Sequence, residues 1–265
     1  MTEHETSPAP TEMPKAASNA LRRARDKARR GRYEEALIDL DKALAHGADP
    51  YDCYLHKAEV YTSLGLTHEA LSAAKDAVAA RPKGIAARQA LASLYYRSED
   101  YDAAIAEARE VLRIEPRNLG ALSVLALSYQ HSGKLHSALR IAALLVRLDP
   151  ANVIFHLRWA LILEHLGQIG QAVEIMEQVL QTTKDARIET YLREHLEQLD
   201  LEQLGKAATL AEDDPLFRIS ILRDPHQAVA DRGFVLSESA VQQLYAIADQ
   251  MRKELGTRGS GRTYH

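Results

Sequence analysis

IAARQALASLYYRSEDYDAAIAEAREVLRIEPRN, residues 85–118, contains two blocks of apolar residues at helical spacing, with a short turn between them and a proline near the end. Apolar residues that recur every three or four positions lie on one face of a helix, so each block predicts an amphipathic helix. Proline stops the second helix because it cannot continue the backbone hydrogen bonds. The stretch therefore predicts one pair of helices.

The same pattern returns every 34 residues along the chain. Alanine suits the points where two helices cross closely, and glycine suits a turn that needs a positive φ. One pair of helices cannot bury its apolar face alone, so neighbouring pairs must stack. The recurring series are Ala36, Ala70, Ala104, Ala138 and Ala172; Tyr61, Tyr95 and Tyr129; Pro82, Pro116 and Pro150; and Gly31, Gly65, Gly133 and Gly167, with Glu99 in the slot that the glycines skip.

The period, together with the segments YEEAL, HEALSAA, YDAAIAEA and HSALRIAA, resembles the tetratricopeptide repeat. The resemblance covers about residues 17–186, or roughly five units. It implies an all-α fold, a right-handed superhelical solenoid of about five helix pairs. It also implies that the first helices of the pairs line a concave groove that holds extended or helical peptides.

The pattern divides the chain into five segments. Residues 1–15 have little apolar surface to bury and are expected to be disordered. Residues 16–186 form the repeat array, and the amphipathic segment 187–205 is expected to close it as a capping helix. Residues 206–255 are expected to form a small helical module, and residues 256–265 a flexible tail.

The resemblance also implies which side chains line the groove. Its early part is basic and its later part apolar, so it predicts a protein or peptide ligand with acidic residues at one end and a hydrophobic anchor at the other. Alternatively, some of the leucines contact the protein's own C-terminal tail. The lysine and asparagine clamp of chaperone-binding repeats is absent. The groove positions are Leu21, Arg25, Arg29, Leu55, Glu59, Thr62, Gln89, Ser93, Tyr96, Arg97, Ser123, Leu127, Gln130, His131, Leu157, Leu161, Glu164 and His165.

DPLFRISILRDPHQAVADRGFVLSES, residues 214–239, breaks the repeat. Each of its two Asp-Pro pairs predicts a helix start, with the aspartate as N-cap and proline at the first helical position. Gly233 predicts a left-handed helix stop, and Ser237 predicts the cap of a last amphipathic helix. The apolar face expected for that helix is Val241, Leu244, Tyr245, Ala248 and Met251.

This stretch is similar to the leader-peptide module, related to the nitrile hydratase alpha chain, of bacterial precursors of ribosomally made, modified peptides. The likeness implies a recognition handle for processing or export enzymes. However, the GSG at 259–261 is not a clear cleavage site, and only four residues follow it. A docking element and a simple helical cap therefore stand as two interpretations. The matching residues are Asp214, Pro215, Phe217, Arg218, Leu222, Asp224, Pro225, Ala228, Gly233 and Leu236.

Composition and motifs restrict the function. The net charge of −4 argues against a protein that coats nucleic acid, although residues 15–32 hold eight basic residues and one acid. Such a run is more often the solvated face of a terminal helix. Cys53, the single cysteine, is expected to pack as a small apolar residue. The sequence has no membrane-length apolar run, metal-ligand spacing, phosphate loop or catalytic motif, and predicts no metal, cofactor or membrane partner.

These observations predict a non-catalytic, cytoplasmic bacterial scaffold or adaptor that binds protein partners through its groove. A sharper form links it to a peptide-modification pathway through residues 214–250. One alternative is a leader-bearing precursor or carrier that is processed at its C-terminus. Another is a regulator that binds nucleic acid through the basic N-terminal helix.

Overall fold

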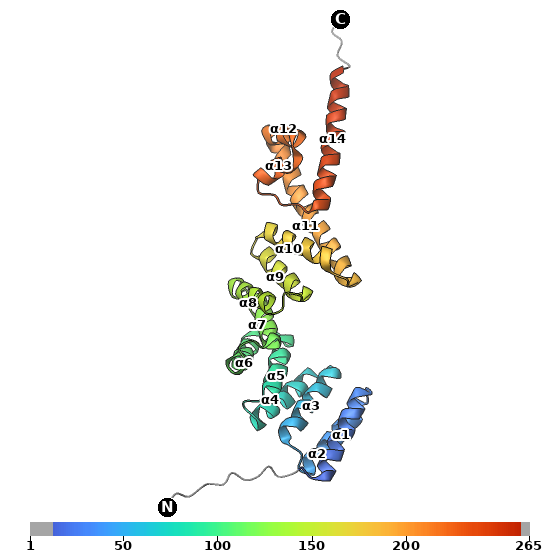
Figure 1. Cartoon of the computed structure of the whole chain (residues 1–265), viewed down its shortest axis with the longest axis vertical. Coiled ribbons are helices and arrows are strands. Elements are labelled where there is room, and N and C mark those ends of the chain that lie inside the picture. The colour runs from blue at the N-terminus through green and yellow to red at the C-terminus, as the bar shows by residue number, and fades with distance from the viewer. Residues whose placement is uncertain (1–12, 261–265) are drawn as a thin grey trace, which may run out of the picture. The chain divides into compact units, whose positions relative to one another are not determined.

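The computed structural model describes residues 13–260 (Figure 1). The chain divides into two compact units, Met1–Ile141 and Ala142–His265. All regular elements in the described residues are helices, which confirms the all-α class. Most of the predicted N-terminal tail and the end of the predicted C-terminal tail, residues 1–12 and 261–265, lie outside the described residues.

The first unit consists of helix pairs in the predicted register. The helices α1, α3, α5 and α7 are the first members of successive pairs, and contacts join α1 to α3, α3 to α5 and α5 to α7. The first helices therefore share one face of this unit. The bounds are α1 Lys15–Arg29, α2 Tyr33–Ala45, α3 Pro50–Ser63, α4 Thr67–Ala80, α5 Ile85–Arg97, α6 Tyr101–Ile114 and α7 Leu119–His131, and α8, Leu135–Leu148, contains the boundary between the units.

The repeating alanines and glycines have the predicted structural roles. Ala36, Ala70 and Ala104 are fully buried where paired helices meet, because a larger side chain would hold the helices apart. The glycines of the turns have positive φ, for example +74° at Gly65. Glu99, which stands in the slot without glycine, takes the same left-handed conformation at φ +60°. The fold therefore imposes this turn even where the residue has a Cβ, at a cost of about 1–2 kcal/mol.

The second unit combines one further helix pair with a region outside the repeat. Phe217 is the largest fully buried side chain of this region and packs with Ala228, Val229 and Leu244. This cluster joins the last four helices into one small core. The helices of the unit after α8 are α9 Val153–His165, α10 Ile169–Thr182, α11 Ala186–Asp213, α12 Pro215–Arg223, α13 Pro225–Asp231 and α14 Glu238–Ser260.

Local signals set the ends of the short helices as predicted. The Asp214 carboxylate accepts the backbone N–H groups of Leu216 and Phe217 at 2.9 and 3.0 Å. Asp224 caps α13 in the same way, and Gly233 closes it at φ +80°. Ser237 Oγ accepts the N–H of Ala240 at 3.3 Å in the first turn of α14.

Three predictions about the second unit are corrected. α11 continues to Asp213 instead of ending at residue 205, because Gly205 is helical and exposed and the stop comes only at the Asp-Pro pair. α14 continues to Ser260, past the predicted start of a flexible tail. The buried stripe of α14 is Ala240, Leu244 and Ala248, whereas Tyr245 and Met251 are about 40% exposed. The stripe is narrow because α14 packs mainly against two short helices, α12 and α13.

Candidate functional site

The predicted groove positions of the first unit lie on α1, α3, α5 and α7, the helices that share one face. Leu21 is an exception: it is 5% exposed and belongs to the core with Ala17, Ala20 and Ala24. These four residues follow the spacing of one helix face, which turns Leu21 away from the groove. The other predicted positions on these helices keep exposed or half-buried side chains.

At the N-terminal part of this face, Arg25, His56 and Glu59 form a hydrogen-bonded chain. Arg25 Nε donates to His56 Nε2 at 2.7 Å, and His56 Nδ1 lies 2.8 Å from Glu59 Oε2. A guanidinium can only donate, so His56 Nε2 must be the acceptor of this hydrogen bond. The hydrogen of the neutral imidazole therefore lies on Nδ1, which donates a hydrogen bond to Glu59 Oε2. These three residues, together with Arg29 and Ser63, are part of the lining of a cavity of about 240 Å³.

The basic character of α1 is partly neutralised by α2. Lys27 Nζ lies 2.8 Å from Asp39 and 3.4 Å from Glu35, and Arg23 lies 3.7 Å from Asp39. Burial opposes the charge of Asp39, yet the hydrogen bond and charge of Lys27 hold the pKa of this carboxyl below its usual value. The side of α1 that meets α2 therefore has a structural use, while Arg25 and Arg29 face the groove.

A pocket of about 290 Å³ lies between α5 and α7. Its lining consists of small side chains and one amide: Gln89, Ala90, Ala92, Ser93, Gly120, Ala121 and Val124. Gln89 Nε2 donates to Asn118 Oδ1 at 2.6 Å, and the same oxygen caps α7 at the N–H of Ala121. A Cβ on Gly120 would stand 2.9 Å from Gln89 Nε2, so any larger residue would intrude on the amide.

Three aromatic rings gather at the other end of α5 and α7. His131 stacks on Tyr101 with ring centroids 5.4 Å apart, and Tyr96 meets the edge of His131 at 5.6 Å. Arg97 is exposed beside Tyr96, and Gln130 precedes His131 with a half-buried side chain. Aromatic rings and arginine are the residue types that contribute most to binding at protein interfaces.

The remaining positions of this face are less available. Leu55 packs against the cluster of Tyr51, Ala77 and Ala87, and Leu127 is half-buried. Thr62 donates its hydroxyl to the backbone carbonyl of Ala58 at 2.7 Å. Ser123 is half-buried too. These side chains form the base of the face rather than its exposed part.

The predicted positions on α9 belong to the second unit. Leu157 and Leu161 are half-buried, and His165 donates from Nδ1 to the carbonyl of Leu161 at 2.6 Å. Glu164 is held by His195 of α11, with Oε2 and Nε2 2.7 Å apart. The Glu164 carboxylate, which was predicted to contact a ligand, therefore forms a hydrogen bond with His195 of α11 instead.

Most residues of the leader-like motif have structural roles in the second unit. Phe217 and Pro225 are buried, and Gly233 provides a left-handed turn. Asp214 and Asp224 cap helices, and Asp214 also pairs with Arg232 at 2.6 Å. Leu222 and Leu236 are half-buried and Arg218 is exposed. The motif is therefore accounted for largely by the folding of α12–α14.

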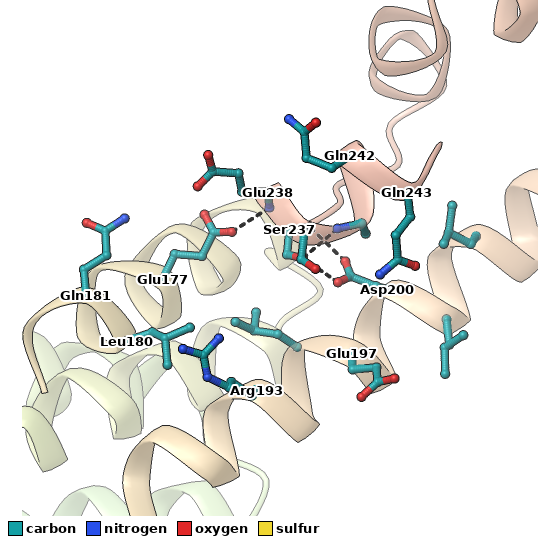
Figure 2. A pocket seen from close by; sticks show the side chains of 15 residues that line it. Glu177, Leu180, Gln181, Arg193, Glu197, Asp200, Ser237, Glu238, Gln242 and Gln243 are labelled. Carbon is teal, nitrogen blue, oxygen red and sulfur yellow. Dashed lines mark hydrogen bonds between the residues drawn. The ribbon is translucent and has the colours of Figure 1, made fainter. Parts of the chain in front are cut away.

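A second, larger pocket lies among α10, α11 and the start of α14 (Figure 2). Asp200 is 7% exposed and accepts the backbone N–H of Ser237 at 2.8 Å and its hydroxyl at 2.5 Å. Glu177 accepts the N–H of Glu238 at 2.7 Å. Two carboxylates from α10 and α11 thus satisfy the free N–H groups that begin α14.

Residues 13–260 hold no group of three or more histidine, cysteine, aspartate and glutamate side chains placed to bind a metal. Within the same residues no helix is long and apolar enough to cross a membrane. Cys53 is fully buried, and burial raises the pKa of its thiol to about 11, as expected for a packing residue.

Comparison with known proteins explains the repeated part. The family model described as tetratricopeptide repeat matches residues 21–85, 63–118 and 89–153, which overlap and together span half of the chain. The chain belongs to the tetratricopeptide repeat family. A search of curated protein sequences finds no significant match to this TPR chain.

Solved TPR structures share the fold at low sequence identity. A structure of MamA from Desulfovibrio magneticus RS-1, residue 41 to the end, is 20% identical with a TM-score of 0.61, over 64% of this chain and 96% of that chain. A TPR protein from Parabacteroides merdae ATCC 43184 is 18% identical with a TM-score of 0.61, over 89% of this chain and 86% of its own. YrrB, described as a TPR protein with an unusual peptide-binding site, is 17% identical with a TM-score of 0.58, over 67% and 92%.

Two residues outside the predicted set, Gly120 and Tyr101, lie beside predicted groove positions. Gly120 gives the clearest signal, because the corresponding slots of the other repeats hold Ser18, Asp52, Ala86 and Ile154. Glycine is the residue there that leaves the pocket beside Gln89 open. Tyr101 begins a second helix, where the register gives no reason to expect a groove contact. Its stacking on His131 is visible only in three dimensions.

Proposed function

We propose that this TPR protein is a non-catalytic adaptor that binds a peptide segment of a partner protein along α1, α3, α5 and α7. The observation that carries the proposal is the pocket at Gly120, where the repeat register is broken in a way that opens space. Glycine within a helix costs about 1 kcal/mol relative to alanine. A Cβ at this position would stand 2.9 Å from the amide nitrogen of Gln89 and 3.4 Å from Asn118 Oδ1, so the glycine leaves room both for the hydrogen bond between these two amides and for the pocket beside them.

The groove supplies three kinds of contact to such a peptide. Arg25 and Arg29 bring positive charge that suits an acidic residue. The Gly120 pocket accepts one compact apolar side chain, and the amide of Gln89 at its edge can both donate to and accept from a peptide backbone. The rings of Tyr96 and His131 offer an aromatic surface farther along the face. A peptide with an acidic residue followed by a small apolar one fits this order.

The test is selection of peptides from a phage-displayed library of random 12-residue sequences, followed by affinity measurement on the selected peptides. Wild-type protein is expected to enrich peptides that share an acidic and an aliphatic position. Gly120→Leu fills the pocket and is expected to weaken binding at least tenfold, roughly the loss of one anchor residue. No enrichment by the wild type would refute the proposal.

The chain provides a matched control for this substitution. Gly205 is also an exposed helical glycine, and no atom lies within 4 Å of the position that its Cβ would take. Gly205→Leu therefore makes the same chemical change outside the groove and is expected to leave affinity within about twofold of wild type. Equal weakening by both substitutions would show that the peptides bind elsewhere.

A further inference from the structure

We infer that the pocket among α10, α11 and α14 is a second binding site, which takes a basic, amphipathic segment of a partner protein. It lies in the non-repeat part of the molecule, and the proposal does not depend on the groove. The pocket encloses about 660 Å³, within the range of about 300–1,000 Å³ that is typical of ligand sites. Figure 2 shows its lining converging from the three helices.

Part of the pocket wall is apolar. Leu180 of α10 and Leu196, Leu201 and Leu204 of α11 contribute aliphatic side chains to the lining. Leu201 is 66% exposed, one of the most exposed large apolar side chains in the described residues. A single exposed leucine is ordinary, but this one borders a cavity in which Leu180 and Leu204 are half-buried and Leu196 is buried. An apolar anchor of a partner can therefore be covered from more than one side.

The rim is acidic. Four carboxylates line the pocket, from Glu177, Glu197, Asp200 and Glu238, against the single guanidinium of Arg193. Arg193 is paired with Glu189 at 2.9 Å, so its charge is already compensated within α11. Asp200 and Glu177 accept backbone N–H groups of α14, while Glu197 and Glu238 are exposed. The uncompensated negative charge selects a positively charged occupant.

The two properties together define the occupant. A small cation would leave Leu201 in water, and a purely apolar segment would bury the exposed carboxylates without a partner, which is costly. A segment with an aliphatic residue flanked by lysine or arginine satisfies both. The exposed amides of Gln242 and Gln243 at the mouth of the pocket can hydrogen-bond to its backbone.

The test uses a fluorescein-labelled, 14-residue peptide of leucine and lysine with amphipathic helical spacing, and a second peptide in which glutamate replaces lysine. Fluorescence anisotropy with full-length protein at low and moderate salt gives the affinity. The lysine peptide is expected to bind in a salt-sensitive manner. The double variant Glu197→Lys/Leu201→Ser is expected to weaken its binding at least tenfold. Both positions are exposed on α11, so the fold is expected to be retained.

A matched variant separates the pocket from general electrostatic attraction. Glu212→Lys/Leu216→Ser makes the same changes of charge and polarity at exposed positions of the same unit outside the pocket lining. It is expected to stay within about twofold of wild type. Equal weakening by both double variants, equal binding of the glutamate peptide, or no binding of either peptide would each overturn the inference.

A second copy of this chain also presents a strongly basic segment, residues 15–32. Sedimentation of the protein alone over a range of concentrations distinguishes this occupant. The inference expects no difference in association between wild type and Glu197→Lys/Leu201→Ser. Self-association of the wild type that the pocket variant abolishes would assign the site to another copy and overturn the choice of a partner protein.

Discussion

The repeated helices of the first unit and the helices α11–α14 of the second are stabilised in different ways. In the repeats, residues at equivalent positions have the same structural role in successive helix pairs, as the buried alanines Ala36, Ala70 and Ala104 show. In α11–α14, each contact occurs once, such as Asp200 with Ser237 or Asp214 with Arg232. In the repeats, therefore, a residue that departs from the register is a candidate functional residue. In α11–α14 there is no register to depart from, so only the three-dimensional contacts indicate a functional residue.

The first prediction tests how far the unique core of α11–α14 depends on one residue. Phe217→Ala is expected to cost about 3–5 kcal/mol of stability, because it empties the centre of the cluster that Phe217 forms with Ala228, Val229 and Leu244. Hydrogen exchange should show loss of protection in α12–α14 while α3–α6 keep theirs. Leu216→Ala, at a neighbouring residue that is 76% exposed, should change stability little. Uniform loss of protection along the chain would contradict the comparison.

The second prediction concerns the start of α14. Asp200→Ala removes the acceptor of the Ser237 N–H and hydroxyl, which are buried, and is expected to cost about 2–3 kcal/mol. Chemical denaturation followed by circular dichroism measures the effect. Glu197→Ala, an exposed carboxylate one turn earlier in α11, is the control and should change stability by less than about 0.5 kcal/mol. Equal effects would mean that the cap does not stabilise α14.

The third prediction restores the register instead of breaking it. Glu99→Gly places glycine in the left-handed slot of the third turn and is expected to raise stability by about 1 kcal/mol, because the Cβ is removed from a position with φ +60°. Glu99→Ala keeps the Cβ and should give no such gain. The same thermal or chemical denaturation applies to both. A gain with alanine equal to that with glycine would show that the side chain of Glu99, and not its backbone, is unfavourable.

The fourth and smallest effect is a dependence on pH. The backbone N–H of Phe217 and the guanidinium of Arg232 lower the pKa of Asp214 below its usual 3.8. A depressed pKa in the folded state stabilises the protein above the unfolded value, and this contribution is lost as the pH falls through the folded pKa. Asp214→Asn keeps an N-cap but removes the charge. The stability difference between the two proteins should be present at neutral pH and vanish in acid; a difference independent of pH would contradict this origin.

Much of the fold could be predicted because its signals are local or periodic. The period places the helix pairs, and the Asp-Pro pairs at Asp214 and Asp224 place the starts of α12 and α13. The prediction that α11 ends at Gly205 was wrong, because the sequence does not distinguish a glycine inside a helix from one that ends it. Leu21 was misassigned because it packs into a core with Leu40 and Cys53, whereas the same slot in α3 and α5 holds half-buried Leu55 and Gln89.

Less of the site could be predicted, for a geometric reason. The register placed Arg25, Gln89 and Tyr96 on first helices, which share one face in the structure. The hydrogen bond of His56 to Arg25 joins residues 31 positions apart and could not be predicted in this way. The lining of the C-terminal pocket includes Asp200 and Ser237, which are 37 residues apart and share no period. No spacing rule connects such residues, so the pocket could be found only in the structure.

Cys53 has a practical consequence for anyone who labels this protein. It is the only cysteine of the chain, and its burial and high pKa keep it slow to react with thiol reagents under native conditions. A cysteine placed at exposed Ser63, on the lining of the groove beside Arg29, would then be the single fast-reacting thiol. A fluorophore attached there can report the arrival of a peptide in real time, without first removing the native residue.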